Sequence, residues 1–326
     1  MKPHSGRLRI VLTLGTTQTL SWGSTFYLPA ILAQPIAGDL GVSIGAVYAA
    51  FSLSLVVTAL LGPVAGRRID RYGGRDVLAV SNVVFAVGLT LLAVAPGPLM
   101  LYLAWVVIGV GMAMGLYEAA FSTLAGIYGH GARPAITGIT LIAGLASTIC
   151  WPITGLLEAE VGWRGACAVW AAVHVLVALP LNRLLIPLRV QPVAGVEPPT
   201  TGRSSTLTMV VLAFVFAVTW FISTAMAAHL PRLLQETGLT AGSIGVAALV
   251  GPAQVVGRLT EFTLLGRFHP LVPARLAAVA HPIGALCLLA AGSPAAVLFT
   301  LLHGAGNGIL TIAKGTLPLA LFGPAG

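Results

Sequence analysis

Residues 66–75 read Gly-Arg-Arg-Ile-Asp-Arg-Tyr-Gly-Gly-Arg and separate two long apolar segments, 43–65 and 77–95. Each flanking segment has about the 20 apolar residues that a helix needs to cross the hydrocarbon core of a bilayer. The arginines between them match the excess of positive charge in cytoplasmic loops of membrane proteins. The stretch therefore predicts two membrane helices joined by a loop that lies in the cytoplasm.

The composition extends this interpretation to the whole chain. Of the 326 residues, 57% are hydrophobic and only 8% are charged, and the mean hydropathy is +0.96. A water-soluble domain carries about 25% charged residues. Because a lipid-facing backbone must satisfy its own hydrogen bonds, the apolar segments are expected to be helices. We predict an all-α integral membrane protein with about ten transmembrane helices, near residues 10–33, 43–65, 77–95, 98–124, 135–156, 164–186, 207–229, 241–262, 272–292 and 295–318.

The positive charges orient the chain. With the N-terminus inside, all of the 17 lysines and arginines except Arg164 and Arg232 fall on the inner side. This predicts a multi-pass protein of the inner (plasma) membrane with a cytoplasmic N-terminus. The N-terminal segment resembles a signal peptide, but its apolar run extends to Leu32, so we expect an uncleaved first helix. The net charge of +8 lies in short loops, so no nucleic-acid partner is expected.

Motifs for catalysis, cofactors or metals are absent from the sequence. The cysteines Cys150, Cys167 and Cys287 lie in apolar segments without metal-ligand spacing, so we expect them to pack as small apolar residues. There is no phosphate-binding Gly-x-x-x-x-Gly-Lys-Ser/Thr loop, His-Glu-x-x-His motif or Gly-x-Ser-x-Gly elbow. We therefore expect a protein that is not an enzyme and that binds neither a cofactor nor a metal.

A polar, Pro-rich segment divides the chain. Residues 187–206 predict a cytoplasmic linker between a six-helix bundle, 1–186, and a four-helix part, 207–326. The two parts share short matches at an offset of about 190–200 residues. The matches are Trp22 with Trp220, Gly66-Arg67 with Gly257-Arg258, Asp70 with Glu261, and Gly109-x-Gly111 with Gly306-x-Gly308. Their common order predicts parallel halves related by an axis along the membrane normal.

The loop, the linker and the repeat together resemble the major facilitator superfamily of secondary transporters. The loop pattern of that family is Gly-x-x-x-Asp-Arg-x-Gly-Arg-Arg, and this chain has Gly74 where an arginine is common. The residues that match are Gly66, Asp70, Arg71, Gly73 and Arg75. Trp151-Pro152-x-x-Gly155 and Gly162-Trp163-Arg164 also resemble the family. The resemblance implies two helical bundles around a central cavity, which is lined by spans one, four, seven and ten and opens to each side in turn.

The resemblance also carries a difference in length. Such transporters usually have twelve spans, whereas about ten are predicted here. On this comparison we expect the C-terminal bundle to lack two helices. The chain would then be a truncated product, a sequence fragment or a protein that has lost transport.

The loop residues have individual expected roles. We expect Gly66 to let neighbouring helix ends approach closely and Gly73 to permit a tight turn. Asp70 can accept hydrogen bonds from nearby arginines or from backbone N–H groups. In the family, the equivalent acid helps latch the two bundles, and we expect that latch to be weaker here. The alternative is an ordinary positive loop without a latch. The expected counterpart in the second half comprises Gly257, Arg258 and Glu261.

Several polar and aromatic residues in the spans are candidates for a solute or coupling-ion cavity. Glu118 in the fourth span is the most informative, because an ionisable group in a membrane helix is a functional candidate by default. Its alternative role is a structural ion pair, for which Lys314 is a candidate partner. The other candidates are Gln18, Trp22, Tyr27, Trp220, His303 and Asn307. For the tryptophans the alternative is packing or interfacial anchoring.

The histidines and glycines within the spans have two expected uses. His174, His281 and His303 could carry protons, or each could bond within its bundle. Gly111-x-x-x-Gly115 and Gly304-x-x-x-Gly308 predict close helix packing.

These features predict a secondary active transporter that moves a small organic solute by alternating access. Its expected partners are the lipid bilayer, the solute and protons as the coupling ion. The sparse charge within the spans favours an apolar or amphipathic solute over a multiply charged one. The alternative function is a transport-inactive, truncated membrane protein or a sensor-like scaffold.

Overall fold

The structure is a computed structural model that describes residues 3–188, 206–239 and 242–322. Helices make up the secondary structure of these residues. The chain divides into two compact units, Met1–Pro192 and Val193–Pro324, and each is described by itself. The linker predicted at 187–206 falls largely outside the described residues, so the domain boundaries taken from the sequence stay a prediction.

The first unit contains nine α-helices, a short 3-10 helix (η1) and a π-helical turn (η2) within its described residues. Their bounds are α1 Pro3–Ser24, α2 Pro29–Leu40, α3 Ile44–Tyr72, α4 Gly74–Ala93, α5 Pro98–Gly115, α6 Tyr117–Tyr128, η1 Gly129–Ala132, α7 Arg133–Ala143, α8 Ala146–Val173, η2 His174–Ala178 and α9 Leu179–Leu185.

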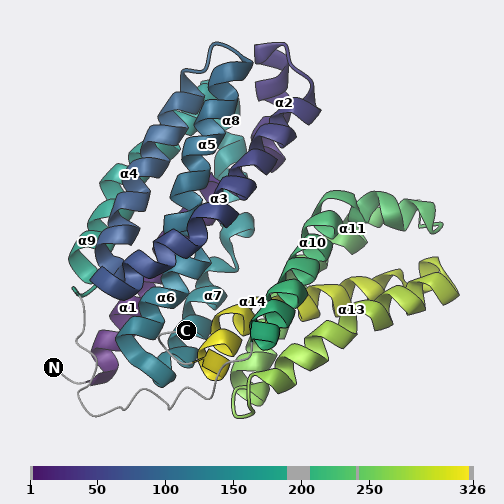
Figure 1. Cartoon of the computed structure of the whole chain (residues 1–326). Coiled ribbons are helices and arrows are strands. Elements are labelled where there is room, and N and C mark those ends of the chain that lie inside the picture. Colours follow the sequence, from purple (N-terminus) through teal and green to yellow (C-terminus); the bar gives the residue numbers. More distant parts are fainter. Residues whose placement is uncertain (1–2, 189–205, 240–241, 323–326) are drawn as a thin grey trace. The chain divides into compact units, whose positions relative to one another are not determined.

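The core of the first unit forms where α5 packs between α3 and α4 (Figure 1). Glycines let these helices approach: a Cβ placed on Gly109 would lie 2.5 Å from the Ser54 carbonyl oxygen of α3. Fully buried Phe85 and Trp105 fill the space beside the contacts. On the other side of the unit, α1 packs against α7 and α8. Close glycine contacts and large apolar side chains thus hold the bundle together.

The second unit contains α10 Thr206–Glu236, α11 Ser243–Ala248, α12 Val250–Thr260, the π-helical turn η3 Glu261–Leu265, α13 Leu271–Ala291, the 3-10 turn η4 Ser293–Ala295 and α14 Ala296–Phe322. The helix α14 packs against both α12 and α13. Glycines again make these contacts close, because Gly304 faces the Val250 backbone and Gly257 faces the Ala305 backbone. The close packing predicted for Gly304-x-x-x-Gly308 is therefore present, against α12.

Large apolar side chains cover much of the outer surface. Leu60, Phe221 and Leu289 are 71%, 74% and 83% exposed. In the most apolar 18-residue stretch of α3, only 17% of the residues are buried. In the corresponding stretch of α10, none are buried. Monomeric proteins in water rarely expose apolar surfaces of this extent, whereas lipid tails solvate such surfaces. The all-α membrane fold that the sequence predicts is confirmed.

The number of spans differs from the prediction of about ten. Within the described residues, seven helical runs are long and apolar enough to cross a membrane: Ile44–Tyr72, Gly74–Ala93, Pro98–Tyr128, Ile149–Leu185, Thr206–Met226, Leu271–Ala291 and Ser293–Phe322. The predicted segments are largely helical, but several are interrupted or merged. The lower count therefore reflects helix breaks that a hydropathy profile does not detect.

The breaks have identifiable positions. The first predicted span, 10–33, is interrupted between Ser24 and Pro29, and the eighth, 241–262, is divided between α11 and α12. The fifth and sixth predicted spans share α8, inside which Gly162 has a φ of 69° and turns the chain. Glycine adopts this conformation without the strain that a Cβ would impose.

Candidate gating loop and solute site

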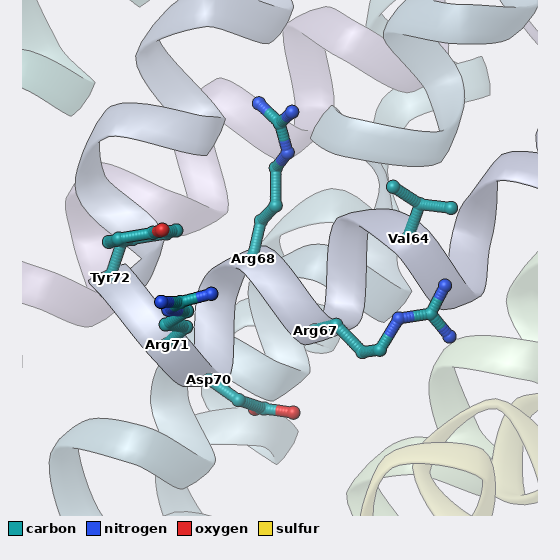
Figure 2. Close-up of a pocket in the computed structure, with 6 residues that line it drawn as sticks. All are labelled: Val64, Arg67, Arg68, Asp70, Arg71 and Tyr72. Atoms are coloured by element: carbon teal, nitrogen blue, oxygen red, sulfur yellow. The ribbon is translucent and has the colours of Figure 1, made fainter.

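The gating loop, residues 66–75, forms the end of α3, a one-residue turn and the start of α4. Gly73 makes the turn with a φ of 88°, as expected for a glycine at this position. Its neighbours on α3 line an open pocket, in which Arg67 and Arg68 point to different sides of the helix (Figure 2). The Arg71 guanidinium lies 5.3 Å from the Tyr72 ring centroid.

Asp70 reaches a neighbouring helix of its own unit. Its carboxylate Oδ1 accepts a hydrogen bond of 3.4 Å from the Ser122 hydroxyl of α6. The sequence pointed to arginines or backbone N–H groups as donors, whereas the donor here is a serine hydroxyl. The bond ties the end of α3 to α6 within the first unit.

The close approach expected at Gly66 occurs at Gly74 instead. A Cβ on Gly66 would meet nothing within 4 Å, so close packing does not explain that glycine in the described residues. A Cβ on Gly74 would lie 2.5 Å from Thr123 Cβ of α6. The steric contact therefore explains the glycine at the position where the family commonly has arginine.

Gly74→Ala is expected to destabilise the protein by about 1–2 kcal/mol, because Thr123 is buried and has to shift. The matched control is Gly66→Ala, which meets open space on a helix and should be neutral or stabilising by a few tenths of a kcal/mol. Midpoints of thermal unfolding in detergent compare the two variants. Equal effects of both substitutions would contradict this interpretation of Gly74.

Arginines bind the two opposite ends of α4. At its start, Arg75 Nε lies 3.2 Å from Asp76 Oδ1, and Arg183 of α9 pairs with the same carboxylate. At its end, Arg164 donates to the Ala93 and Ala95 carbonyls at 2.9 and 2.8 Å. Arg164 also pairs with Asp39 Oδ2 at 2.8 Å. Asp39 and Asp76 are not among the residues predicted from the sequence, although the position of Asp76 in the first turn of a helix is a recognised signal.

In the first unit, the candidates Gln18 and Trp22 lie buried on α1. Gln18 Nε2 donates to the Gly115 carbonyl at 2.7 Å, at the point where α5 ends. The Trp22 ring lies 4.9 Å from the ring of Tyr117, the first residue of α6. Tyr27 follows in the turn after α1, where its carbonyl accepts from Trp151 Nε1 at 3.1 Å. Gln18 and Trp22 thus contact the junction of α5 and α6, whereas Tyr27 contacts α8.

That junction interrupts the predicted fourth span. Leu116 has extended dihedral angles, φ −90° and ψ −168°, between α5 and α6. Glu118 therefore sits in the first turn of a new helix, where the helix dipole favours a negative charge. Its side chain is exposed. Broken helices whose N-termini face a cavity are a recurrent feature of transporter sites.

In the second unit, Trp220 and Asn307 lie on neighbouring helices. The Lys314 ammonium of α14 lies 3.6 Å from the Trp220 ring centroid of α10. One helical turn away, the Ser223 hydroxyl donates to Asn307 Oδ1 at 2.8 Å. All four side chains are half-buried. The sequence identified Trp220 and Asn307, but not Ser223, whose spacing of three from Trp220 places both on one helix face.

Lys314 was the candidate ion-pair partner of Glu118. The two residues belong to different units, so a pair between them stays a prediction. The cation–π contact with Trp220 gives Lys314 a partner within its own unit.

The remaining candidates in the second unit are buried. His303 of α14 contacts His281 of α13. Arg258 and Glu261 are only 5% and 2% exposed, and Arg258 Nη2 lies 3.5 Å from Gln254 Oε1. Gly257 makes a backbone contact rather than a loop turn. The three residues predicted as a counterpart of the gating loop therefore lie inside the helical packing.

Comparison with known proteins indicates a single family of membrane transporters. A model of the Major Facilitator Superfamily matches residues 14–325. An uncharacterized 38 kDa protein in the 23S RNA operon of Thermoproteus tenax is 29% identical over 296 residues, which are 90% of this chain and 75% of that protein. An MFS-type efflux pump of Mycolicibacterium smegmatis is 31% identical over 268 residues, 76% of this chain and 61% of the pump.

Solved structures share the fold at low identity. The proton:xylose symporter XylE has a TM-score of 0.72 at 13% identity, with 99% of this chain and 84% of that chain covered. The transporter FucP in its outward conformation has a TM-score of 0.68 at 16% identity, with coverage of 97% and 88%. At these identities the comparison shows the fold alone.

Proposed function

Because this chain belongs to the Major Facilitator Superfamily, a family of membrane transporters, we propose that it moves a small organic solute by alternating access. The observation that carries the proposal is the half-buried group on α10 and α14, in which Lys314 contacts Trp220 and Ser223 contacts Asn307. An aromatic face beside a few polar groups suits binding of a small molecule.

The first unit contributes a comparable set. Gln18 and Trp22 of α1 lie against the start of α6, and Glu118 stands one residue beyond Tyr117. In the repeat predicted from the sequence, α1 matches α10 and α5 matches α14. We propose that each set is a solute-binding or ion-binding region of its own unit, with Tyr27 as a further candidate in the first unit and His303 in the second.

The proposed solute has an apolar or ring-shaped face and few charges. The tryptophans offer ring surfaces, whereas the amides of Gln18 and Asn307 offer hydrogen bonds. Proteins of the same fold include a proton:xylose symporter and an organic anion transporter, and a sequence relative is an efflux pump. We infer that a proton gradient drives transport, because Glu118 is an ionisable group in a broken membrane helix.

The proposed location is the inner cell membrane, with the N-terminus in the cytoplasm. The start of α4 carries Arg75 and contacts Arg183, whereas Arg164 binds its opposite end. The end of α3, which leads into the start of α4, carries Arg67, Arg68 and Arg71 of the candidate gating loop. This asymmetry favours the first end as the cytoplasmic one. We propose that Asp70 acts there as a gating residue, and that Gly257, Arg258 and Glu261 form its counterpart.

Transport is tested with the purified chain in proteoliposomes, with and without a pH gradient. The probes are labelled xylose, labelled fucose and the cationic dye ethidium. We expect gradient-dependent accumulation of at least one probe, and Glu118→Gln should lower it about tenfold, a loss of about 1.4 kcal/mol. Asp70→Asn is measured in parallel and should lower the rate.

The matched control is Glu160→Gln, which removes an exposed acid near the Gly162 turn. This variant should transport at the rate of the unmodified chain. Failure to move any probe or any protons would favour the transport-inactive alternative. Equal losses in both glutamate variants would show that Glu118 has no specific role.

A further inference from the structure

Two histidines meet inside the second unit. His281 of α13 and His303 of α14 approach with Nδ1 atoms 3.0 Å apart and ring centroids 4.8 Å apart. The side chains are only 6% and 2% exposed. A nitrogen–nitrogen distance of 3.0 Å requires a hydrogen between the atoms, so one ring donates an Nδ1–H to the bare Nδ1 of the other.

This hydrogen bond determines where a further proton can bind. In the neutral pair, the donor ring carries its hydrogen on Nδ1 and has a bare Nε2, whereas the acceptor ring carries Nε2–H. Within the described residues, His281 Nε2 is buried without a hydrogen-bond partner. When His281 is the donor ring, a proton added to its Nε2 makes it an imidazolium and leaves the bridge intact; when His303 is the donor ring, the proton binds His303 Nε2 in the same way. The bridge then becomes a charge-assisted hydrogen bond, which is stronger.

The same geometry limits the pair to one added proton. The lone pair of the acceptor Nδ1 is already occupied by the bridge. A second positive charge would also lie next to the first, at a distance where like charges repel strongly. The two rings therefore titrate as one unit.

Other ionisable side chains stand on the elements packed around the pair. Among the side chains that the structure describes, they are Arg275 and Cys287 on α13, Lys314 on α14, Arg258 on α12, Glu261 in η3 and Glu236 on α10. In the described part of the chain, the polar and ring contacts of the two imidazoles are with each other and with Phe299. No cluster of three His, Cys, Asp or Glu side chains occurs among the described residues, which leaves too few ligands for a metal centre.

We propose that His281 and His303 form a proton-binding dyad that holds a coupling proton in the second unit, in addition to the one proposed at Glu118 in the first unit. The proposal rests on the proposed function, because a coupling ion needs a transported solute. The position supports it: His303 lies one turn before Asn307 on α14, and Asn307 accepts the hydrogen bond from Ser223 of α10. A charge on the dyad therefore arises one helical turn from the proposed solute-binding residues of the second unit.

The close helix packing around the dyad supports a connection between its protonation and the neighbouring solute-binding residues. Gly304 and Gly308 hold α14 against the backbone of α12, and Gly306 holds it against α13. A Cβ on Gly306 would lie 3.3 Å from His281 Nε2 and 3.0 Å from the Ala277 carbonyl oxygen. The dyad thus occupies a contact between helices where small displacements reach the neighbours directly.

The test is a pH titration of the full chain in liposomes, labelled with ¹⁵N-histidine and followed by solid-state NMR from about pH 9 to pH 4. We expect the His281 and His303 signals to change together, with uptake of one proton by the pair. His174 serves as an internal reference, because both of its ring nitrogens bond to neutral side chains. In His303→Leu the His281 signal should lose the nitrogen–nitrogen bridge and no longer change together with a second ring.

Independent titration of the two rings, or no titration over this range, would overturn the dyad. Gly306→Ala provides a second variant that keeps both histidines and should shift the midpoint of the joint titration. A titrating dyad in a chain that transports no probe would refute the proposed function and leave the proton site standing. Gradient-driven transport with a dyad that never changes protonation would refute the coupling role alone.

Discussion

Gly308→Ala is expected to lower the free energy of unfolding by about 2–3 kcal/mol, because the added Cβ overlaps backbone atoms. Gly308 of α14 faces Gln254 of α12, and the new atom would lie 3.0 Å from Gln254 Cα and closer still to its carbonyl oxygen. A backbone carbonyl cannot rotate away as a side chain can. The two helices have to separate, which also loosens the nearby contact of Gly304 with Val250.

The control for this prediction lies on the facing helix. Gly251 of α12 is exposed, and a Cβ there would meet nothing within 4 Å. Gly251→Ala should gain a few tenths of a kcal/mol from the higher helix propensity of alanine. Unfolding of the purified variants in mixed micelles, followed by tryptophan fluorescence, measures both effects. A Gly308→Ala variant as stable as Gly251→Ala would show that α12 and α14 pack less closely than described.

Comparable backbone contacts occur in both units. In the first unit, Gly109 faces the Ser54 backbone across the α3–α5 contact, as Gly308 faces Gln254 across the α12–α14 contact. The two contacts are of the same kind, although the sequence repeat matches Gly109 with Gly306 rather than with Gly308. A glycine that faces a backbone should tolerate substitution less well than Gly74, whose neighbour is the side chain of Thr123.

The fold class follows from the sequence because the hydropathy shows that lipid surrounds most of the chain. Within lipid, only a few backbone structures satisfy their own hydrogen bonds. The interruptions do not follow from it. Leu116 lies in a continuous apolar segment, yet its extended conformation ends α5. The Gln18 amide satisfies the Gly115 carbonyl there, and a bond between residues 97 positions apart leaves no local signal.

The sequence predicted which candidate residues lie within the membrane, but not which of their side chains contact each other. The position of Trp220 and Asn307 along their spans placed them in the membrane. Which side chains face each other depends on the rotation of each helix about its axis, which a single sequence does not fix. For the same reason, the glycine with a steric role proved to be Gly74 rather than Gly66.

The interior of the first unit holds a further buried histidine, in a different setting from the dyad. His174 is 0% exposed; its Nδ1 lies 2.9 Å from Asn82 Oδ1, and its Nε2 lies 2.8 Å from the Ser24 hydroxyl. Asn82 Nδ2 donates to the Leu78 carbonyl at 2.7 Å, which identifies Oδ1 as the acceptor facing the imidazole. The neutral ring therefore donates from Nδ1 and accepts at Nε2. This network joins α1, α4 and η2.

His174→Leu is expected to cost about 3–4 kcal/mol of folding free energy, since it leaves Asn82 Oδ1 buried without a donor and loses ring contacts with Phe85. Ser24→Ala should cost less, about 1 kcal/mol, although it removes a partner of the same ring. The decisive variant combines His174→Leu with Asn82→Leu, because removing both polar partners removes the stranded acceptor. The double variant should be at least about 1 kcal/mol more stable than the sum of the single effects predicts. Strict additivity in denaturant unfolding would mean that the imidazole and the amide are not coupled in the folded bundle.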